Sequence, residues 1–133
     1  MGTSGRQPYD FVVAKDSRTF GDMMTSQGMR DIAAYANGVG PDKSSIMGLD
    51  ANGKLTDPTD LIRNAHNAGL IVHPYTFRPE NTFLPPSLRS GADNTRNVNG
   101  SITEIQAFLR AGVDGFFTDD PAVGRQAVST FKR

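Results

Sequence analysis

The chain has 133 residues, a length that suits one modest domain with a core of its own. Its 14 acidic and 14 basic residues balance, and this lack of a basic excess argues against a nucleic-acid-binding protein. The absence of cysteine excludes disulfides and cysteine metal sites, and no apolar run approaches the roughly 20 residues of a transmembrane span. Residues 1–7 are expected to be a flexible lead, and they contain no apolar signal-peptide core.

Four helices are predicted from capping residues and apolar spacing. Thr25 is expected to cap a helix over residues 25–36, and Asp57 to cap a second helix that ends before Gly69. A capping-box pattern at Ser101 predicts a third helix up to Gly112, and Asp120 is expected to cap a closing helix. The residues expected to face inward are Met29, Ile32, Ala33 and Ala36, then Leu61, Ile62, Ala65 and Ala68, then Ile102, Ile105, Phe108 and Leu109, and finally Val123, Ala127, Val128 and Phe131.

Short apolar strands are predicted directly after the first three of these helices, over residues 39–41, 70–76 and 113–118. The last two are apolar runs rather than alternating patterns, as expected for parallel strands covered on both faces. This order favours an α/β fold, either an open doubly wound sheet or a (β/α) barrel. Because no glycine-rich phosphate-binding motif follows a strand, we favour the barrel.

The loops are strongly asymmetric in length. Helices join the following strands through one or two residues, whereas the strands are followed by the long segments 41–56 and 79–100. In a (β/α) barrel the loops after the strands form the face on which ligands bind. The two long loops are therefore expected to shape a substrate site.

Four segments of the chain, residues 8–14, 32–41, 68–81 and 111–121, occur in an order and spacing typical of a known family. They resemble the glycerophosphodiester phosphodiesterase family, in particular its bacterial periplasmic or secreted members. Residues 8–14 and 32–41 (PYDFVVA and IAAYANGVGP) resemble the region around barrel strand six. Residues 68–81 (AGLIVHPYTFRPEN) resemble strand seven with its loop, and residues 111–121 (AGVDGFFTDDP) resemble strand eight. The resemblance implies that residues 1–133 are a partial domain, the C-terminal portion of a TIM (β/α)8 barrel.

The family resemblance implies metal-dependent hydrolysis of glycerophosphodiesters to an alcohol and glycerol 3-phosphate, in lipid and glycerol metabolism. The family's two catalytic histidines, in a His-Arg-Gly strand and a His-Asp turn, and its metal-binding carboxylates on strands two and three have no counterpart here. We therefore expect no catalytic residue and no metal ligand in this chain, with calcium or magnesium bound only by the complete enzyme. Periplasmic or secreted localisation is implied in the same way.

Five residues are candidates for the wall of a substrate pocket: His73, Tyr75, Thr76, Phe117 and Asp119. The resemblance places an aromatic residue of the pocket at Tyr75, although an aromatic at such a position can equally be core. His73 lies within a predicted strand, where a buried or pocket-lining histidine is more common than a metal ligand.

Other polar residues are given structural roles. His66 is expected to be a solvated histidine at a helix C-terminus, and Asp120 a helix cap. Glu80 belongs to a Pro-Glu-Asn-Thr sequence whose likeness to a family motif is interpreted as coincidence. Residues 50–54 are interpreted as an Asn-Gly turn rather than a calcium loop.

Three barrel strands alone form an open sheet with two unpaired edges, which invites self-association or aggregation. The chain alone is expected to lack phosphodiesterase activity, and its Met1-Gly2-Thr3-Ser4-Gly5 lead fits a start placed between barrel strands. The alternative is a genuine short barrel-derived protein that acts in binding or interaction without catalysis.

Overall fold

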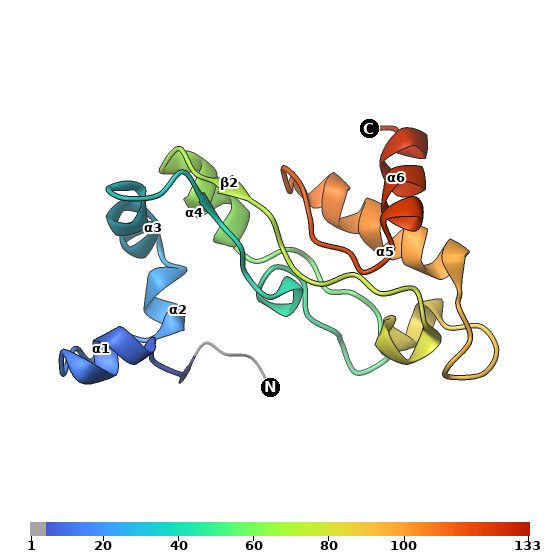
Figure 1. Cartoon of the computed structure of the whole chain (residues 1–133), viewed down its shortest axis with the longest axis horizontal. Coiled ribbons are helices and arrows are strands. Elements are labelled where there is room, and N and C mark those ends of the chain that lie inside the picture. Colours follow the sequence, from blue (N-terminus) through green and yellow to red (C-terminus); the bar gives the residue numbers. More distant parts are fainter. Residues whose placement is uncertain (1–4) are drawn as a thin grey trace.

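A computed structural model describes residues 5–133 of the chain. The structure is elongated, with the N-terminal helices at one end and the two C-terminal helices at the other (Figure 1). The α-helices are α1 (Tyr9–Val13), α2 (Phe20–Met23), α3 (Ser26–Ala33), α4 (Leu61–Asn67), α5 (Val98–Ala111) and α6 (Pro121–Thr130); the strands are β1 (Gly38–Val39) and β2 (Ile71–Val72); and the 3-10 turns are η2 (Lys43–Ser45), η3 (Asn81–Phe83) and η4 (Pro86–Leu88).

Two of the predicted helix caps are confirmed. The Thr25 side chain accepts a hydrogen bond from Gly28 N at the start of α3, and the Asp120 side chain accepts one from Val123 N at the start of α6. Gly112 ends α5 in the left-handed conformation at φ 109°, which glycine adopts without strain. Two short helices, α1 and α2, were not predicted from the sequence, although the capping box of α2, Thr19 with Asp22 three residues later, is present there.

Two predicted helix starts are wrong. Helix α4 begins at Leu61 rather than after Asp57, because Thr59 is bonded into the preceding loop: its N donates to Ile46 O (2.8 Å) and its Oγ1 to Ser45 O (2.7 Å). Helix α5 begins at Val98 rather than at Ser101, because the Asn97 side chain accepts from Gly100 N and caps the helix one turn earlier. The two long loops therefore run to residues 60 and 97.

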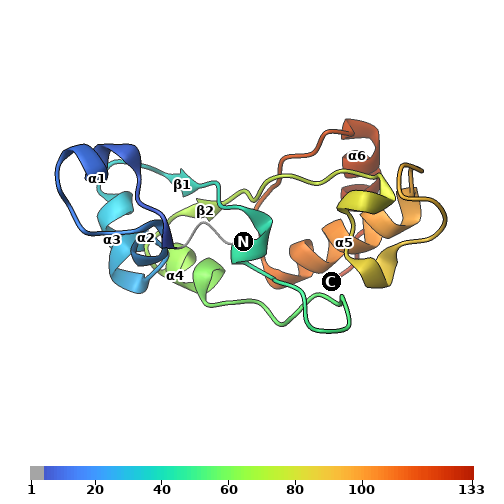
Figure 2. The same ribbon diagram turned by 90° about the horizontal axis from the view of Figure 1, so that it is seen from below.

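Strand β1 pairs in parallel with β2, with Gly38 opposite Ile71 and Val39 opposite Val72 (Figure 2). Two more main-chain hydrogen bonds extend this pairing: His73 N donates to Val39 O (3.0 Å) and Tyr75 N to Pro41 O (3.1 Å). The regular strand β2 covers only Ile71–Val72, whereas a strand was expected over residues 70–76, a stretch that contains Pro74. A proline cannot donate to a sheet ladder.

The third predicted strand, residues 113–118, is an extended segment on the other side of β2 rather than a regular strand. Asp114 N donates to Val72 O (3.0 Å) and Phe117 N donates to Pro74 O (2.9 Å). Between these two hydrogen bonds the third segment advances by three residues and the central segment by only two. The extra residue forms a bulge, which interrupts the regular ladder. Pairing resumes where Asp119 N donates to Phe77 O (3.0 Å). The three segments run parallel, in the expected order.

Burial alternates along the central segment, contrary to the expectation of strands covered on both faces. Val72 and Phe77 are fully buried on the helical side, and the Phe77 ring meets Phe108 of α5 edge-on at 5.1 Å. Ile71 and Tyr75 remain 47% and 41% exposed on the other side. In the part of the chain described here, helices cover only one face of the sheet, and the opposite face has no covering layer.

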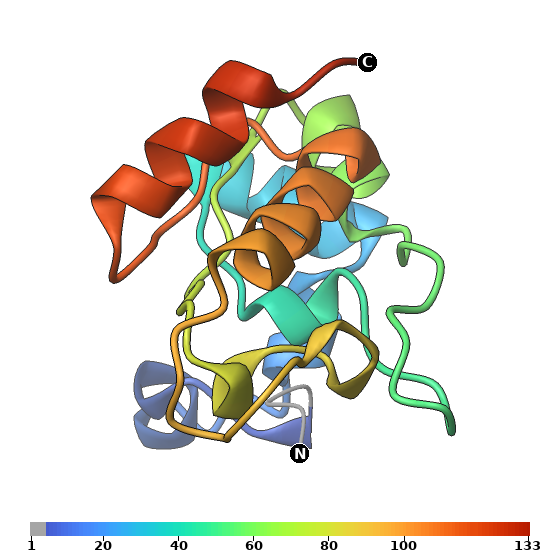
Figure 3. The same ribbon diagram turned by 90° about the vertical axis from the view of Figure 1, so that its right-hand side faces the viewer.

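The core joins the inner faces of the helices to this sheet, and α5 and α6 pack side by side at its C-terminal end (Figure 3). The predicted inward residues of α3, α4 and α5 are buried or partly buried. On α6 the prediction is wrong for Val128, which is 51% exposed.

The expected flexible lead falls partly outside the described residues, which begin at Gly5. The described part is tied down: Gln7 Nε2 donates to Asp16 O (2.7 Å) and Phe20 N donates to Arg6 O (2.8 Å). Among the described residues, no helix combines the length and apolar character that crossing a membrane requires.

Candidate functional site

A polar hollow of about 270 Å³ lies where the parallel segments end. Tyr75 and Thr76 line it from the central segment, and Lys43 lines it from the neighbouring loop. Lys43 N donates to Tyr75 O (2.8 Å), so the main chain holds these two residues at a fixed spacing. Two of the five predicted pocket residues thus lie together in a hollow at the carboxyl ends of the strands, where parallel α/β sheets bind ligands.

Asp119 lies at the end of the third segment and is joined to this hollow through an arginine. Arg78, which lines the hollow, places its Nε 2.7 Å from Asp119 Oδ2 and its guanidinium carbon 4.8 Å from the centre of the Phe83 ring. Both charged groups are about half exposed, so the pair contributes little to stability and instead fixes the position of Arg78. Arg78 was not among the predicted site residues, although it lies only two positions after the predicted strand over residues 70–76.

His73 and Phe117 pair on the uncovered face of the sheet rather than in the hollow. Their rings meet edge-on with centroids 6.4 Å apart, and Phe117 is 56% exposed. The His73 ring lies against Gly115, where an added Cβ would come within 2.8 Å of His73 Nε2. His73 is partly buried on this face, as expected for a side chain that lines a cavity. The exposed Phe117 ring extends the same surface.

Lys43 also reaches α5, where it contacts the one buried acidic side chain among residues 5–133. Lys43 Nζ lies 3.0 Å from Glu104 Oε2 and 5.1 Å from the centre of the Phe77 ring. Glu104 is 1% exposed, and burial raises its pKa above the usual value even though the lysine opposes this shift. The pair anchors the loop after β1 to α5. The sequence pattern predicted Glu104 as the acidic residue of a capping box with Ser101, which is wrong because α5 begins one turn earlier, and it gave Lys43 no role.

The long loop after the central segment is organised around Asn81, which is fully buried. Asn81 Nδ2 donates to Ser90 O (2.6 Å) and Ala92 O (2.9 Å), while its Oδ1 accepts from Ser90 N and from Asn97 Nδ2 (both 3.0 Å). The neighbouring Glu80 contacts the same loop through its main chain, in a bridge with Arg96 and by accepting a hydrogen bond from Phe83 N (3.0 Å). The Pro-Glu-Asn-Thr stretch is thus a structural element, with Asn81 rather than Glu80 as its central residue.

The other predicted turn and cap residues have structural roles as well. Asp50 Oδ1 accepts from Asn52 N (2.8 Å) and Lys54 N (3.0 Å) in the predicted Asn-Gly turn, and Gly53 has φ 71°. Asp120, besides capping α6, forms an ion pair with Arg96. The amide of Val123 and this arginine hold the pKa of Asp120 below its usual value.

His66 is not simply solvated, as expected, but meets an aspartate of the third segment. Its Nε2 lies 2.8 Å from Asp114 Oδ2, which also accepts from Val72 N (2.9 Å). Burial alone would raise the pKa of Asp114, but the hydrogen bonds from His66 and Val72 outweigh it and leave the pKa lowered. This contact joins α4, β2 and the third segment.

The described residues do not form a ligand set for calcium or magnesium. Within residues 5–133 no three histidine, aspartate or glutamate side chains gather closely enough to hold a metal ion. His73 packs against a glycine and a phenylalanine, and Asp119 and Glu104 are paired with Arg78 and Lys43. No chemical step through a metal is therefore built on these side chains.

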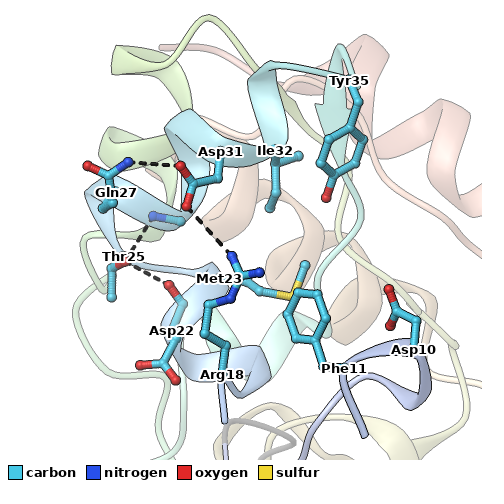
Figure 4. A pocket seen from close by; sticks show the side chains of 11 residues that line it. Asp10, Phe11, Arg18, Asp22, Met23, Thr25, Gln27, Asp31, Ile32 and Tyr35 are labelled. Atoms are coloured by element: carbon cyan, nitrogen blue, oxygen red, sulfur yellow. Dashed lines mark hydrogen bonds and ion pairs between the residues drawn. The ribbon is translucent and has the colours of Figure 1, made fainter. Parts of the chain in front are cut away.

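A separate hollow of about 430 Å³ lies among α1, α2 and α3 and includes none of the predicted site residues (Figure 4). Its one lining arginine, Arg18, is paired with Asp16 at 2.7 Å and lies 3.8 Å from Asp31, while its guanidinium carbon is 4.5 Å from the centre of the Phe11 ring. These contacts of Arg18 join the loop between α1 and α2 to both helices α1 and α3, which is the arrangement of a helix-packing contact.

Comparison with known proteins decides the family. The model of the glycerophosphoryl diester phosphodiesterase family matches residues 21–123, which include all three parallel segments. The chain belongs to this family. Among similar curated proteins are three from Arabidopsis thaliana: glycerophosphodiester phosphodiesterase GDPD6, 36% identical over 103 residues (77% of this chain, 25% of the relative); GDPDL3, 29% identical over 124 residues (84% and 15%); and GDPDL1, 28% identical over 119 residues (86% and 14%).

The chain therefore spans about a quarter or less of each of these relatives. Membership of the family implies a TIM-barrel type of α/β fold. The parallel order of the three segments agrees with such a fold.

Proposed function

We propose that residues 1–133 are the C-terminal part, about strands six to eight, of a glycerophosphodiester phosphodiesterase barrel. The uncovered sheet face supports this proposal most directly. It carries Ile71 and Tyr75 of the central segment and Phe117 of the third segment, large side chains that are 41–56% exposed. On the helical side of the central segment, Val72 and Phe77 are fully buried. In a closed barrel such a face would point into the packed interior and toward the substrate.

The complete enzyme hydrolyses glycerophosphodiesters to an alcohol and glycerol 3-phosphate, in lipid and glycerol metabolism. In this proposal the chain supplies one wall of the substrate pocket: Tyr75 and Thr76 line the hollow, Arg78 is held there by Asp119, and His73 with Phe117 extends the wall along the sheet. The aromatic surface excludes water from one side of the substrate, and the polar hollow provides hydrogen-bonding groups at its edge.

The catalytic histidines and a calcium or magnesium ion belong, in this proposal, to other parts of the complete enzyme, where the ion would neutralise charge on the phosphoryl group. Residues 1–133 alone are then inactive. We also propose that the complete enzyme is of the bacterial periplasmic or secreted type, and that the exposed sheet of the isolated chain associates with other copies.

The test is an activity assay on the longest polypeptide whose reading frame contains this chain. Glycerol 3-phosphate release from glycerophosphoethanolamine, stimulated by calcium or magnesium, is the expected result. The Tyr75→Ala variant should lower kcat/KM by about tenfold, because the pocket wall is lost, whereas Tyr35→Ala, at an exposed position on the far end, should not change it.

Two results would contradict the proposal: absence of hydrolysis in that longer polypeptide, or equal effects of the two tyrosine substitutions. If no longer reading frame exists, the remaining hypothesis is the short non-catalytic binding or interaction protein.

A further inference from the structure

A second cleft, of about 530 Å³, lies beside the hollow and shares Lys43 and Phe83 with it. We call it the α5 cleft. Helix α5 lines it through Glu104 and Phe108, the loop after β1 lines it from another side, and residues 82–85 with Arg89 complete it. Figure 3 shows the helix α5 (orange), the loop after β1 (teal) and the segment around residue 83 (yellow) close together. Its volume falls in the range of small-molecule sites, which is roughly 300–1,000 Å³.

The walls of the α5 cleft are mainly apolar. Besides Phe108 they include Met47, Leu55 and Leu84. The Arg89 guanidinium is occupied by the loop itself, since its Nε donates to Leu84 O (3.0 Å) and its NH2 group to Thr82 O (3.3 Å). A ligand would therefore meet apolar surface together with the Lys43–Glu104 pair.

Glu104 is the unusual member of this lining. Its Oε2 is bonded to Lys43, but its Oε1 is buried and has no hydrogen-bond partner. A buried carboxylate oxygen without a partner is costly, so a group that donates to it would bind with a substantial gain. Because Glu104 is one of the residues that line this mainly apolar cleft, its orphaned oxygen is the observation that points to a ligand.

We propose that the α5 cleft binds an uncharged alcohol with a compact apolar body, whose hydroxyl group donates a hydrogen bond to Glu104 Oε1. An ammonium group fits less well, because Lys43 already supplies the positive charge and Arg89 lines the same cleft. A hydroxyl group can donate a hydrogen bond to the ionised carboxylate of Glu104 and can accept one from its protonated form. It therefore fits Glu104 in either protonation state, which matters because burial raises the pKa of this group. The site is independent of the proposed phosphodiesterase function.

The test uses two isomeric probes, benzyl alcohol and anisole, which have the same atoms but differ in having or lacking an O–H donor. Binding to the full 133-residue chain is followed by NMR, with the methyl group of Met47 as the reporter inside the cleft. Benzyl alcohol should bind at least about tenfold more tightly than anisole and should shift the Met47 signal.

Replacing Glu104 with leucine should abolish the preference for benzyl alcohol and leave the weak binding of anisole unchanged. Arg110→Ala, at an exposed position on the same helix, should keep the preference. Should Glu104→Leu fail to fold, Glu104→Gln, which retains an acceptor oxygen, should still prefer benzyl alcohol.

Equal affinities of the two probes for the unmodified chain would overturn the proposal. So would binding that leaves the Met47 methyl signal unmoved, or a crystal structure in which an ordered water bonded to Glu104 Oε1 stays in place when benzyl alcohol binds elsewhere.

Discussion

Replacing Asn81 with aspartate tests the organisation of the loop that borders the site. The substitution keeps the shape of the side chain and the two bonds that Oδ1 accepts, but it replaces the amide that donates to Ser90 O and Ala92 O. Each lost bond costs about 1 kcal/mol, and the two carbonyls then face a buried anion. Because residues 90 and 92 are exposed, water relieves part of this cost, and we expect a loss of about 2–4 kcal/mol in the free energy of unfolding at neutral pH.

The sign of the pH dependence follows from the burial of this position. One oxygen of the introduced carboxyl group keeps the donors Ser90 N and Asn97 Nδ2, but the other faces two carbonyl oxygens in a buried site. Burial and this repulsion raise its pKa in the folded state above its unfolded value. The native state then binds more protons, and the stability deficit should shrink as the pH falls toward the unfolded pKa of about 4.

Urea unfolding at several pH values measures this effect, with Asn94→Asp in an exposed part of the same loop as the matched control. Amide exchange at Ser90, whose N–H is bonded to Asn81, reports opening of the loop separately from global unfolding. Equal stabilities of the two variants at neutral pH, or a deficit that grows on acidification, would refute the reasoning.

Three further predictions use the same chain. Gly28→Ala should lower the free energy of unfolding by about 1–3 kcal/mol, since a Cβ there would lie 2.3 Å from Asp22 O, whereas Gly48→Ala, with its nearest atom at 3.9 Å, should be nearly neutral in the same urea titration. The raised pKa of Glu104 means that the protonated form favours folding; relative to Glu104→Gln, the unmodified chain should therefore lose stability as the pH rises above 4.5, and a constant difference from pH 4 to 8 would contradict this. Phe117→Lys should reduce self-association in sedimentation velocity experiments, and Tyr9→Lys, at an 82% exposed position outside the sheet, should not; equal effects would show that the sheet face is not the contact.

Local signals in the sequence predicted much of the fold. The caps at Thr25 and Asp120 and the helix end at Gly112 depend on interactions within a few residues, and all three are confirmed. The starts of α4 and α5 could not be read in this way, because Thr59 bonds to a loop fourteen residues away and Asn97 also bonds to Asn81. Contacts between distant segments decide such boundaries.

The location of the candidate site was predicted from where the strands end, and not from contacts between individual residues. The pattern of the central segment located Tyr75 and Thr76, and the structure places both in the hollow. The Lys43–Glu104 pair joins residues 61 positions apart, and no short pattern in the sequence connects them. The bulge near Gly115 and the uncovered sheet face likewise depend on how separate segments meet.

The activity of the isolated chain is the most direct test of its assignment as one wall of a barrel without the catalytic centre. The purified 133-residue protein should release no glycerol 3-phosphate from glycerophosphodiesters in the presence of calcium or magnesium, above a sample without protein. Metal-stimulated release that disappears in the His73→Ala variant would contradict the assignment, because it would place the catalytic centre within this chain.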